Sequence, residues 1–277
     1  MRKTRVLSLG AGVQSSALLL MADRGDIAPI NFAVFSDTQQ ELPETYVWLE
    51  KLIKAVKVKV IKTTKGDLLK DGAFIIPAYL KTPKEADPQI DFTDPNPSTK
   101  YKRGKGKRIC TVDYKISPVR RAVREELGYK KGQHIKGKEF VTMVIGFSTD
   151  EATRMKDADP EDWTENQYPL CMEKNMSRED CKKYVFGIMG EEPPRSSCYF
   201  CPLHDDYEWL RIKENHPEYF EKACQLDEEA RRTKGFNGLM KSEVFLHDSL
   251  VPLREAKFDP AKGKNRVRKM CGGNCKT

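Results

Sequence analysis

The sequence predicts an α/β protein with a parallel β-sheet and helices on both faces, followed by a helical, irregular lobe that carries cysteines. Three observations support this fold class. Short apolar runs alternate with amphipathic stretches, a glycine turn follows the first run, and an acidic and a hydroxyl residue close the second. Strands that alternate with helices in this way are typical of parallel sheets.

The expected elements follow a β-α-β-α-β order and then become less regular. Strands are expected at Arg5–Leu9, Ile30–Phe35, Val58–Ile61 and Phe140–Phe147. Helices are expected at Ser15–Arg24, Pro43–Val56, Pro118–Leu127, Asp206–Asn215 and Pro217–Arg232. Gly25 follows the first helix and Pro43 opens the second, which are the positions where these residues favour helix ends and starts.

Composition and patterning suggest two domains in a cytoplasmic protein. Residues 1–155 are expected to form a nucleotide-binding core, with an irregular basic insertion near 77–108 that is rich in proline. Residues 156–277 would form the cysteine-bearing lobe. The apolar runs are too short to cross a bilayer, and the N-terminal stretch lacks the pattern of a signal peptide, so no membrane partner is expected.

The net charge of +8 favours polyanionic partners. Two basic clusters, Lys100–Arg108 and Lys262–Lys269, each precede a cysteine closely. We interpret them as contacts for nucleic acid, either tRNA or DNA, or for phosphate. The alternative is a solvated loop and a solvated tail.

The glycine turn after the first strand is a candidate phosphate-binding loop. Glycines let a ligand approach the backbone, and the start of the next helix offers N–H donors and a positive dipole end. It is neither a Walker loop nor a dinucleotide fingerprint, because the residues that define those motifs are missing. The alternative is a tight strand-to-helix connection. The candidate residues are Ser8, Gly10, Ala11, Gly12, Gln14, Ser15 and Ser16.

The second strand ends in Ser36 and Asp37, where an open parallel sheet places its ligand crevice. A turn or helix cap at Asp37 is the alternative. The loop, this strand end and Leu42–Tyr46 together resemble the PAPS-reductase-like branch of the PP-loop nucleotide α-hydrolase superfamily. PP-loop enzymes carry Ser-Gly-Gly-x-Asp-Ser, and Gly10–Ser15 departs from this pattern at its first Ser and its Asp. The resemblance implies ATP or a related adenylyl nucleotide with Mg²⁺, and Asp37 near the ribose or the ion.

The cysteines predict a metal centre. Eight cysteines in an intracellular chain are better explained by metal or redox chemistry than by disulfides. Cys198 and Cys201 form a C-x-x-C turn, and Cys271 and Cys275 form a second close pair. Such pairs suit zinc or an iron–sulfur cluster, and spacing does not separate the two. Cys171, Cys181 and Cys224 are interpreted as packing residues.

A further cysteine favours the cluster over zinc. Cys110–Arg121 resembles the segment of assimilatory APS reductases that begins with a Cys-Cys pair. That resemblance implies a 4Fe–4S cluster held by Cys110, Cys198 and Cys201, with Thr111 replacing the fourth ligand. Cys271 or Cys275 would complete the set, or one iron would stay open. The alternatives are Zn²⁺, or a Cys110 that is simply buried.

Charged residues near the strand ends complete the candidate site. Lys115, Arg120 and Arg121 lie on or just before one expected helix, and arginine forks bind phosphate and sulfate. Gly146–Arg154 resembles a segment of the reductases, which implies that Glu151 and Arg154 face the crevice. We therefore expect Lys115, Glu151 and Arg154 to be catalytic and Arg120 to bind the nucleotide. Surface salt bridges are the alternative.

Three functional hypotheses follow. The leading one is an enzyme that adenylylates a target with ATP and then transfers sulfur, onto a nucleic acid, with an iron–sulfur cluster and a sulfur donor protein. The second is a PAPS or APS reductase with Cys271 or Cys275 as the nucleophile. The third is a non-catalytic, zinc-stapled nucleic-acid-binding protein.

Overall fold

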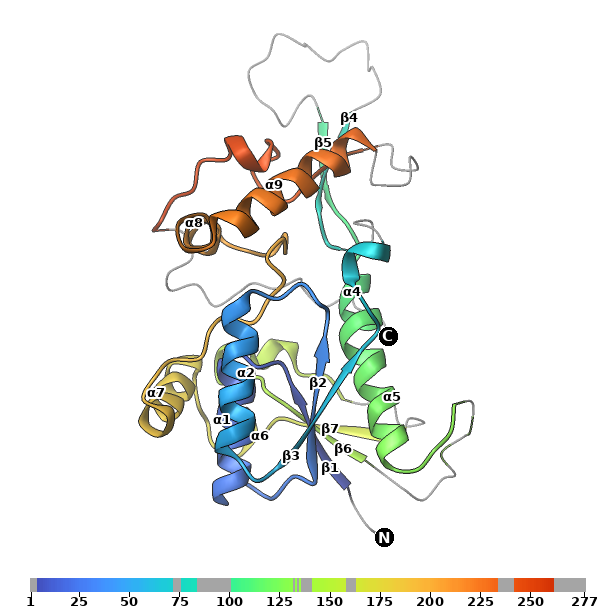
Figure 1. Ribbon diagram of the computed structural model, residues 1–277, viewed down its shortest axis with the longest axis vertical. Helices are drawn as coiled ribbons and strands as arrows, with labels where there is room; N and C mark the ends of the chain where they lie inside the picture. The colour runs from blue at the N-terminus through green and yellow to red at the C-terminus, as the bar shows by residue number, and fades with distance from the viewer. Residues whose placement is uncertain are drawn as a thin grey trace. The chain divides into compact units, whose positions relative to one another are not determined.

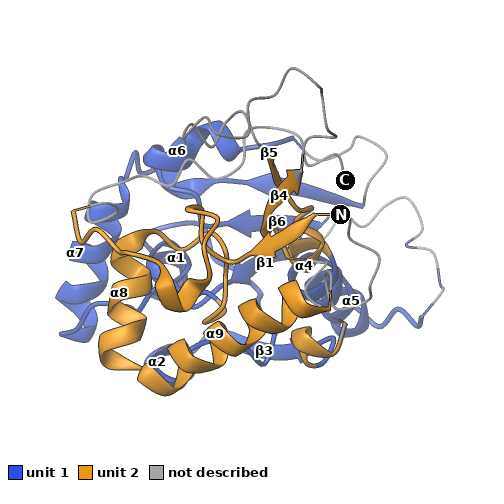
Figure 2. Ribbon diagram, turned by 90° about the horizontal axis from the view of Figure 1, so that it is seen from above, with its two compact units in different colours: residues 1–66, 113–197, 267–277 blue, residues 67–112, 198–266 orange. Residues whose placement is uncertain are grey.

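The computed structural model describes residues 4–71, 76–83, 101–131, 133, 135, 141–157, 163–233 and 242–261. The chain forms two compact units, which Figure 2 distinguishes by colour. Unit 1 comprises residues 1–66, 113–197 and 267–277, and unit 2 comprises residues 67–112 and 198–266. The boundary expected at residue 155 differs from this division, because residues 156–197 supply a strand and helices to unit 1.

Unit 1 is built on a five-stranded sheet in the order β3-β2-β1-β6-β7, in which every neighbouring pair is parallel. The strands are β1 (Thr4–Leu9), β2 (Phe32–Asp37), β3 (Lys59–Thr64), β6 (Val141–Ile145) and β7 (Thr164–Gln167). The parallel α/β fold class is therefore confirmed. The edge strand β7 was not expected, because Thr-Glu-Asn-Gln carries no apolar alternation.

Helices cover both faces of this sheet (Figure 1). One face packs against α1 (Val13–Arg24), α2 (Pro43–Ala55), α6 (Pro169–Met172) and α7 (Arg178–Met189), and the other packs against α5 (Ser117–Glu126). Alternate side chains of β1 serve the two cores: Leu7 and Leu9 face α1, whereas Val6 faces α5. Gly25 closes α1 in the left-handed conformation, as expected.

The strand order creates a switch point beside β1. The chain runs outward from β1 to β2 and β3, and then returns to place β6 on the other side of β1. Connections on the two sides of a switch point diverge, which opens a crevice at the carboxyl ends of the strands. Residues that follow β1 and β6 are therefore the ones that border this crevice.

Unit 2 contains an antiparallel sheet in the order β5-β4-β8. Its strands are β4 (Tyr79–Pro83), β5 (Tyr101–Lys105) and β8 (Glu243–Phe245), and its helices are α4 (Ile109–Thr111), α8 (Asp206–Asn215) and α9 (Pro217–Arg232). Short 3₁₀ turns lie at η1 (Leu68–Asp71) and η5 (Leu253–Glu255).

The segment near 77–108 was expected to be irregular, and this expectation is wrong for the described ends of the segment. These ends pair with each other as β4 and β5. Tyr79 lies opposite Lys105, and the Lys105 ammonium lies 4.8 Å from the centre of the Tyr79 ring. Such cross-strand pairs stabilise a hairpin although the segment is basic. Residues 84–100 lie outside the described part of the chain.

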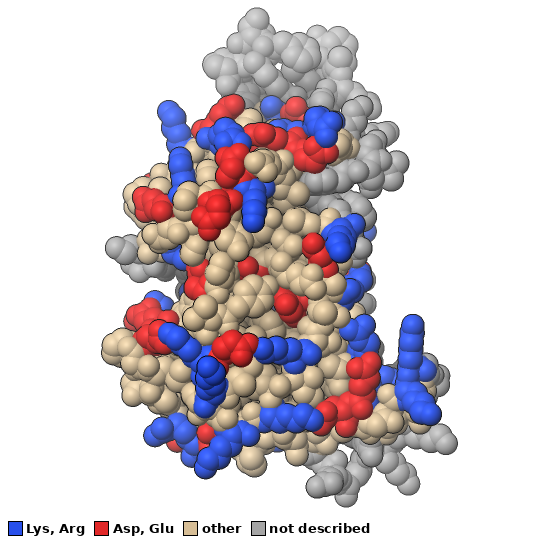
Figure 3. Space-filling model, in the orientation of Figure 1, with Lys and Arg blue, Asp and Glu red and all other residues tan. Residues whose placement is uncertain are grey.

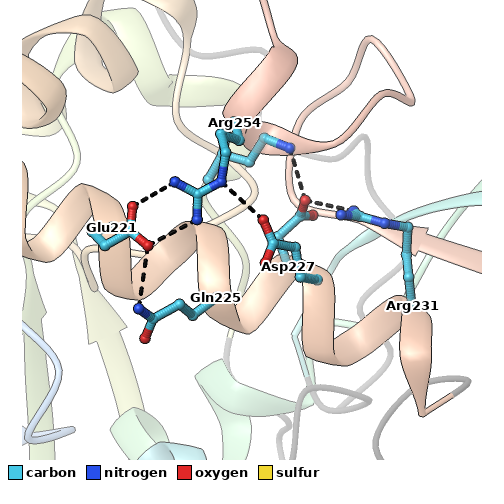
Figure 4. Close-up of polar contacts among 7 residues, drawn as sticks. Glu221, Gln225, Asp227, Arg231 and Arg254 are labelled. Atoms are coloured by element: carbon cyan, nitrogen blue, oxygen red, sulfur yellow. Dashed lines mark hydrogen bonds and ion pairs between the residues drawn. The ribbon is translucent and has the colours of Figure 1, made fainter.

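A fully buried carboxylate organises unit 2 (Figure 4). Asp227 on α9 accepts hydrogen bonds from the backbone N–H of Leu246 and of Leu253, each at 2.8 Å, and it pairs with Arg231 at 2.5 Å. Nearby, Arg254 forms exposed ion pairs with Glu221 and Glu228. Asp227 thus fastens the segment that runs from β8 to η5 onto α9.

No helix in the described part of the chain is long and apolar enough to cross a membrane.

Candidate functional site

The loop after β1 has the backbone geometry of a ligand-binding turn. Ala11 adopts a left-handed conformation with φ of 53° and is fully buried, and Gly12 is the N-cap of α1 without a side-chain cap. A non-glycine residue in this conformation carries strain that the surrounding structure must hold. The first turn of a helix also leaves backbone N–H groups without intrahelical partners. The loop therefore presents an N–H-rich surface suited to an anion.

The two serines of the loop make different hydrogen bonds. Ser15 closes the loop internally, since its Oγ accepts from the N–H of Gly10 at 3.2 Å and donates to the carbonyl of Gly12 at 3.3 Å. Ser16 is fully buried and its Oγ accepts from Trp48 Nε1 at 2.9 Å. Ser16 thus joins α1 to α2. Ser8 lies half-buried within β1, between Val34 and Ile145 of the neighbouring strands.

The end of β6 packs directly against the start of α1. A Cβ on Gly146 would lie 3.0 Å from Ser15 N and 3.2 Å from the carbonyl carbon of Gln14. Because both neighbours are backbone atoms, only glycine fits without a shift of the helix. Gly146 therefore allows the end of β6 to approach the start of α1 closely at the switch point.

Three predicted site residues come together beside this contact. Gln14 Nε2 donates to Glu151 Oε2 at 2.9 Å and lies 3.4 Å from Ser148 Oγ. Glu151 forms an ion pair with Arg154 within the 3₁₀ turn η4 (Thr149–Arg154), and the Arg154 guanidinium lies 4.3 Å from the centre of the Phe147 ring. Gln14, Glu151 and Arg154 thus form one polar group next to the loop.

Lys115 is linked to the loop through Glu41 and Ser196, two residues that were not predicted from the sequence. It lies on a π-helical turn, η3 (Val112–Ile116), and its Nζ donates to Glu41 Oε1 at 3.1 Å. Glu41 Oε2 accepts from Ser196 Oγ at 3.2 Å, and Ser196 Cβ lies 3.6 Å from the position of a Cβ on Gly12.

The burial of the Glu41 side chain explains why its ion pair with Lys115 is well defined. The Glu41 side chain is 1% exposed and the Lys115 side chain is 42% exposed. A buried carboxylate needs a partner, so Glu41 holds the Lys115 amine in place while the rest of the lysine meets solvent. No local motif marks Glu41 or Ser196, because their importance arises from distant contacts.

The residues at the end of β2 are engaged locally. Asp37 Oδ1 accepts from the N–H of Gln39 at 2.7 Å and from the Tyr46 hydroxyl at 2.8 Å. Burial and the adjacent Asp37 raise the pKa of Tyr46. Ser36 Oγ donates to the carbonyl of Tyr114 at 2.6 Å, which ties β2 to η3. These contacts fit the turn-forming alternative for Asp37, and a ligand role for it stays a prediction.

Arg120 lies toward the other end of the sheet. Its Nη1 donates to Thr164 at 3.1 Å and its guanidinium lies 4.8 Å from the centre of the Trp163 ring. Thr164 begins β7, whereas the loop follows the end of β1. Arg121 instead donates to the carbonyl of Thr64, the last residue of β3, at 2.8 Å. The structure thus brings Arg121, and not Arg120, to the carboxyl edge.

The three described candidate metal cysteines all belong to unit 2. Cys198 and Cys201 form the expected turn, in which the Cys201 N–H donates to the Cys198 carbonyl at 3.0 Å, and Cys110 lies in α4. The described cysteines form no disulfide. Within the described ranges, the sulfurs of Cys110, Cys198 and Cys201 do not lie within 4.8 Å of one another as a single-ion site would require. Cys271 and Cys275 lie outside these ranges, so the metal set stays a prediction.

Two other thiols should resist alkylation in the folded protein. Burial raises the pKa of Cys181 to about 12 and that of Cys224 to about 11. Because the thiolate is the reactive form, we expect neither residue to react with iodoacetamide at pH 8 until urea unfolds the chain. Peptide mass spectrometry measures this, with the urea-unfolded chain as the reference for complete labelling. Rapid native labelling of Cys181 would contradict its assignment as a packing residue.

The same shifts set a pH limit on stability. Both thiols have a higher pKa in the folded state than in the unfolded state. Their contribution to the free energy of unfolding is therefore fully present below the unfolded-state pKa of about 9. This contribution is lost as the pH rises through the pKa values of the two thiols in the folded state.

The fold defines a doubly wound α/β protein whose switch point lies beside the loop after β1. No protein-family model matches the sequence, and no curated protein matches it. Among solved structures, the chain is similar to phosphoadenylyl-sulfate (PAPS) reductase from Candida auris in a phosphate complex. The identity is 15% and the TM-score is 0.40, over 71% of this chain and 76% of that chain. A superposition of this quality does not establish a shared activity.

Charges of both signs alternate on the face drawn in Figure 3. Exposed ion pairs of unit 1 include Lys51 with Glu191 and Lys62 with Glu50. The face in view is therefore mixed rather than uniformly basic. Of the two basic clusters, Lys262–Lys269 lies outside the described residues, and the other includes the exposed strand β5.

Proposed function

We propose that unit 1 binds ATP or a related adenylyl nucleotide, with its phosphates on the loop Gly10–Gly12 and the start of α1. The observation that carries this proposal is the geometry of the switch point. A left-handed Ala11, an N-cap glycine and a glycine at the end of β6 converge there. Backbone N–H groups at such a position suit phosphate better than any neutral ligand.

The charged residues around the loop support a phosphate ligand. Lys115 and Arg154 are each paired with a carboxylate, which orients the cation without burying it. Cations fixed in this way bind phosphate oxygens with charge-assisted hydrogen bonds. Glu151, held by Gln14, is a carboxylate beside the loop that would hold Mg²⁺. It would supply the acidic group that the PP-loop pattern has at the position of Gln14.

The proposed reaction is adenylyl transfer followed by sulfur transfer. A carbonyl oxygen of the acceptor attacks the α-phosphorus of ATP, and the bond to pyrophosphate breaks. Sulfide-level sulfur from the donor protein then attacks the activated carbon, and the carbon–oxygen bond breaks to release AMP. A 4Fe–4S cluster on the cysteines, or Zn²⁺ in its place, belongs to this proposal, as do a nucleic-acid acceptor and a sulfur donor protein. Lys115 and Arg154 would stabilise charge on the phosphates as that bond breaks.

The test measures labelled AMP from α-labelled ATP, and pyrophosphate by a coupled enzyme assay, with anaerobically purified protein and tRNA or DNA. Lys115→Met should lower the rate by about 100-fold, because one charged donor to the phosphates is lost. Lys54→Met, which removes an exposed lysine on α2, is the matched control and should leave the rate unchanged. If no nucleic acid elicits AMP while PAPS or APS yields sulfite with thioredoxin, the reductase alternative replaces the proposed reaction.

A further inference from the structure

Unit 2 contains a cluster of metal-ligand side chains that is separate from its cysteines. Asp206 is the first residue of α8, and His247 and Asp248 follow β8. One ligand atom from each of the three lies within 4.8 Å of the others. Asp206 and His247 are 7% and 4% exposed, whereas Asp248 is exposed. Two ligands are therefore fixed in the interior, and the third lies at the surface.

The atoms of the two buried side chains that point away from the cluster are held by neighbours. Asp206 Oδ2 accepts from the N–H of Asp259 at 3.0 Å, whereas His247 Nδ1 accepts from the N–H of Ser249 at 3.2 Å and lies 2.7 Å from Ser249 Oγ. The imidazole also packs edge-on against Phe258. Asp206 Oδ1 and His247 Nε2 lie 3.1 Å apart as a hydrogen-bonded pair. In the ion-bound state the ring proton would sit on Nδ1 and be donated to Ser249 Oγ, which is the usual support of a metal-binding histidine.

The spacing of the three atoms matches that of ligands on one ion. His247 Nε2 lies 3.1 Å from Asp206 Oδ1 and 3.7 Å from Asp248 Oδ1. Metal–nitrogen and metal–oxygen bonds of about 2.1 Å at tetrahedral angles separate ligand atoms by about 3.4 Å. These two separations bracket this value, and the ligand atoms of Asp206 and Asp248 lie within 4.8 Å of each other.

We propose that Asp206, His247 and Asp248 bind one first-row divalent cation through one nitrogen and two oxygens, with water in the remaining positions. Two carboxylates and a neutral imidazole carry two negative charges, which a divalent ion neutralises. The imidazole favours zinc, cobalt or nickel over magnesium or calcium, which prefer oxygen ligands alone. The ion would join the start of α8 to the segment after β8, and so stabilise unit 2.

Cobalt(II) titration of the chelator-treated full chain tests this site. Its absorption distinguishes thiolate ligands, which give intense sulfur-to-cobalt bands, from nitrogen and oxygen ligands, which do not. We expect one equivalent of cobalt without the sulfur bands, and a rise in the thermal midpoint of the protein on binding.

Asp248→Asn is the informative variant, because Asp248 is exposed and its loss should not prevent folding. The affinity of the sulfur-free equivalent should fall at least about tenfold, whereas Glu255→Gln, which removes a nearby exposed carboxylate, should leave it unchanged. His247→Gln, checked for folding by circular dichroism, should abolish that equivalent. The proposal is overturned if the wild-type chain binds no cobalt outside thiolates, or if Asp248→Asn binds it as tightly as the wild type. Asp206 and His247 would then be a hydrogen-bonded pair that only braces α8.

Discussion

Replacing Gly146 with alanine is expected to abolish tight nucleotide binding while leaving a folded protein. The new methyl group would lie 3.0 Å from Ser15 N and 3.2 Å from the carbonyl carbon of Gln14, and neither backbone atom moves without the helix. The start of α1 must therefore retreat from β6, which costs about 1–3 kcal/mol of unfolding free energy. The N–H groups would no longer converge on the phosphates. Calorimetry with ATP should show at least about a tenfold weaker affinity.

Gly187→Ala is the matched control for that change. Gly187 lies in the last turn of α7, and a Cβ there meets no atom within 4 Å. Alanine is the better helix former by about 1 kcal/mol, so this variant should be at least as stable as the wild type. Its affinity for ATP should be unchanged. Equal ATP affinity in both variants would show that the approach of β6 to α1 does not shape the nucleotide site.

Asp227→Asn is expected to cause the largest loss of stability. The change replaces one carboxylate oxygen with an N–H donor that faces the backbone N–H of Leu246 or Leu253, and it leaves Arg231 without its anionic partner. Breaking a buried pair in this way costs about 3–5 kcal/mol. Urea unfolding followed by circular dichroism measures the difference.

Glu229→Gln provides the comparison on the same helix. Glu229 also pairs with an arginine of α9, Arg232, but the two side chains are 39% and 74% exposed. Exposed pairs contribute little, so the urea midpoint should barely move. If the two variants unfolded at the same urea concentration, the backbone bonds to Asp227 would not be what fastens β8 and η5 to α9.

Local sequence signals predicted most elements of unit 1 and the two long helices of unit 2. The bounds of α8 and α9 are those expected, since each helix has an apolar face and clear end signals. The strands β4, β5 and β8 were missed. Their pairing joins residues near 80 to residues near 245, and short basic segments give no sign of so distant a partner.

The candidate site was predictable to the extent that its residues directly follow strands. Gln14, Glu151 and Arg154 come together as expected, because the loops after β1 and β6 meet at the switch point. Glu41 and Ser196 carry no motif and gain their place through contacts across unit 1.

The difference between Arg120 and Arg121 has a geometric cause. Successive helical residues point about 100° apart, so a shift of one position turns a side chain toward another part of the sheet. A resemblance that aligns two adjacent arginines cannot choose between them.

A crystal structure of the full chain with bound ATP is the sharpest test of the proposed nucleotide site. We expect phosphate oxygens within hydrogen-bonding distance of backbone N–H groups between Gly10 and Ser15, with Lys115 or Arg154 on the same phosphates. A nucleotide bound elsewhere on the chain, with its phosphates away from this loop, would contradict it.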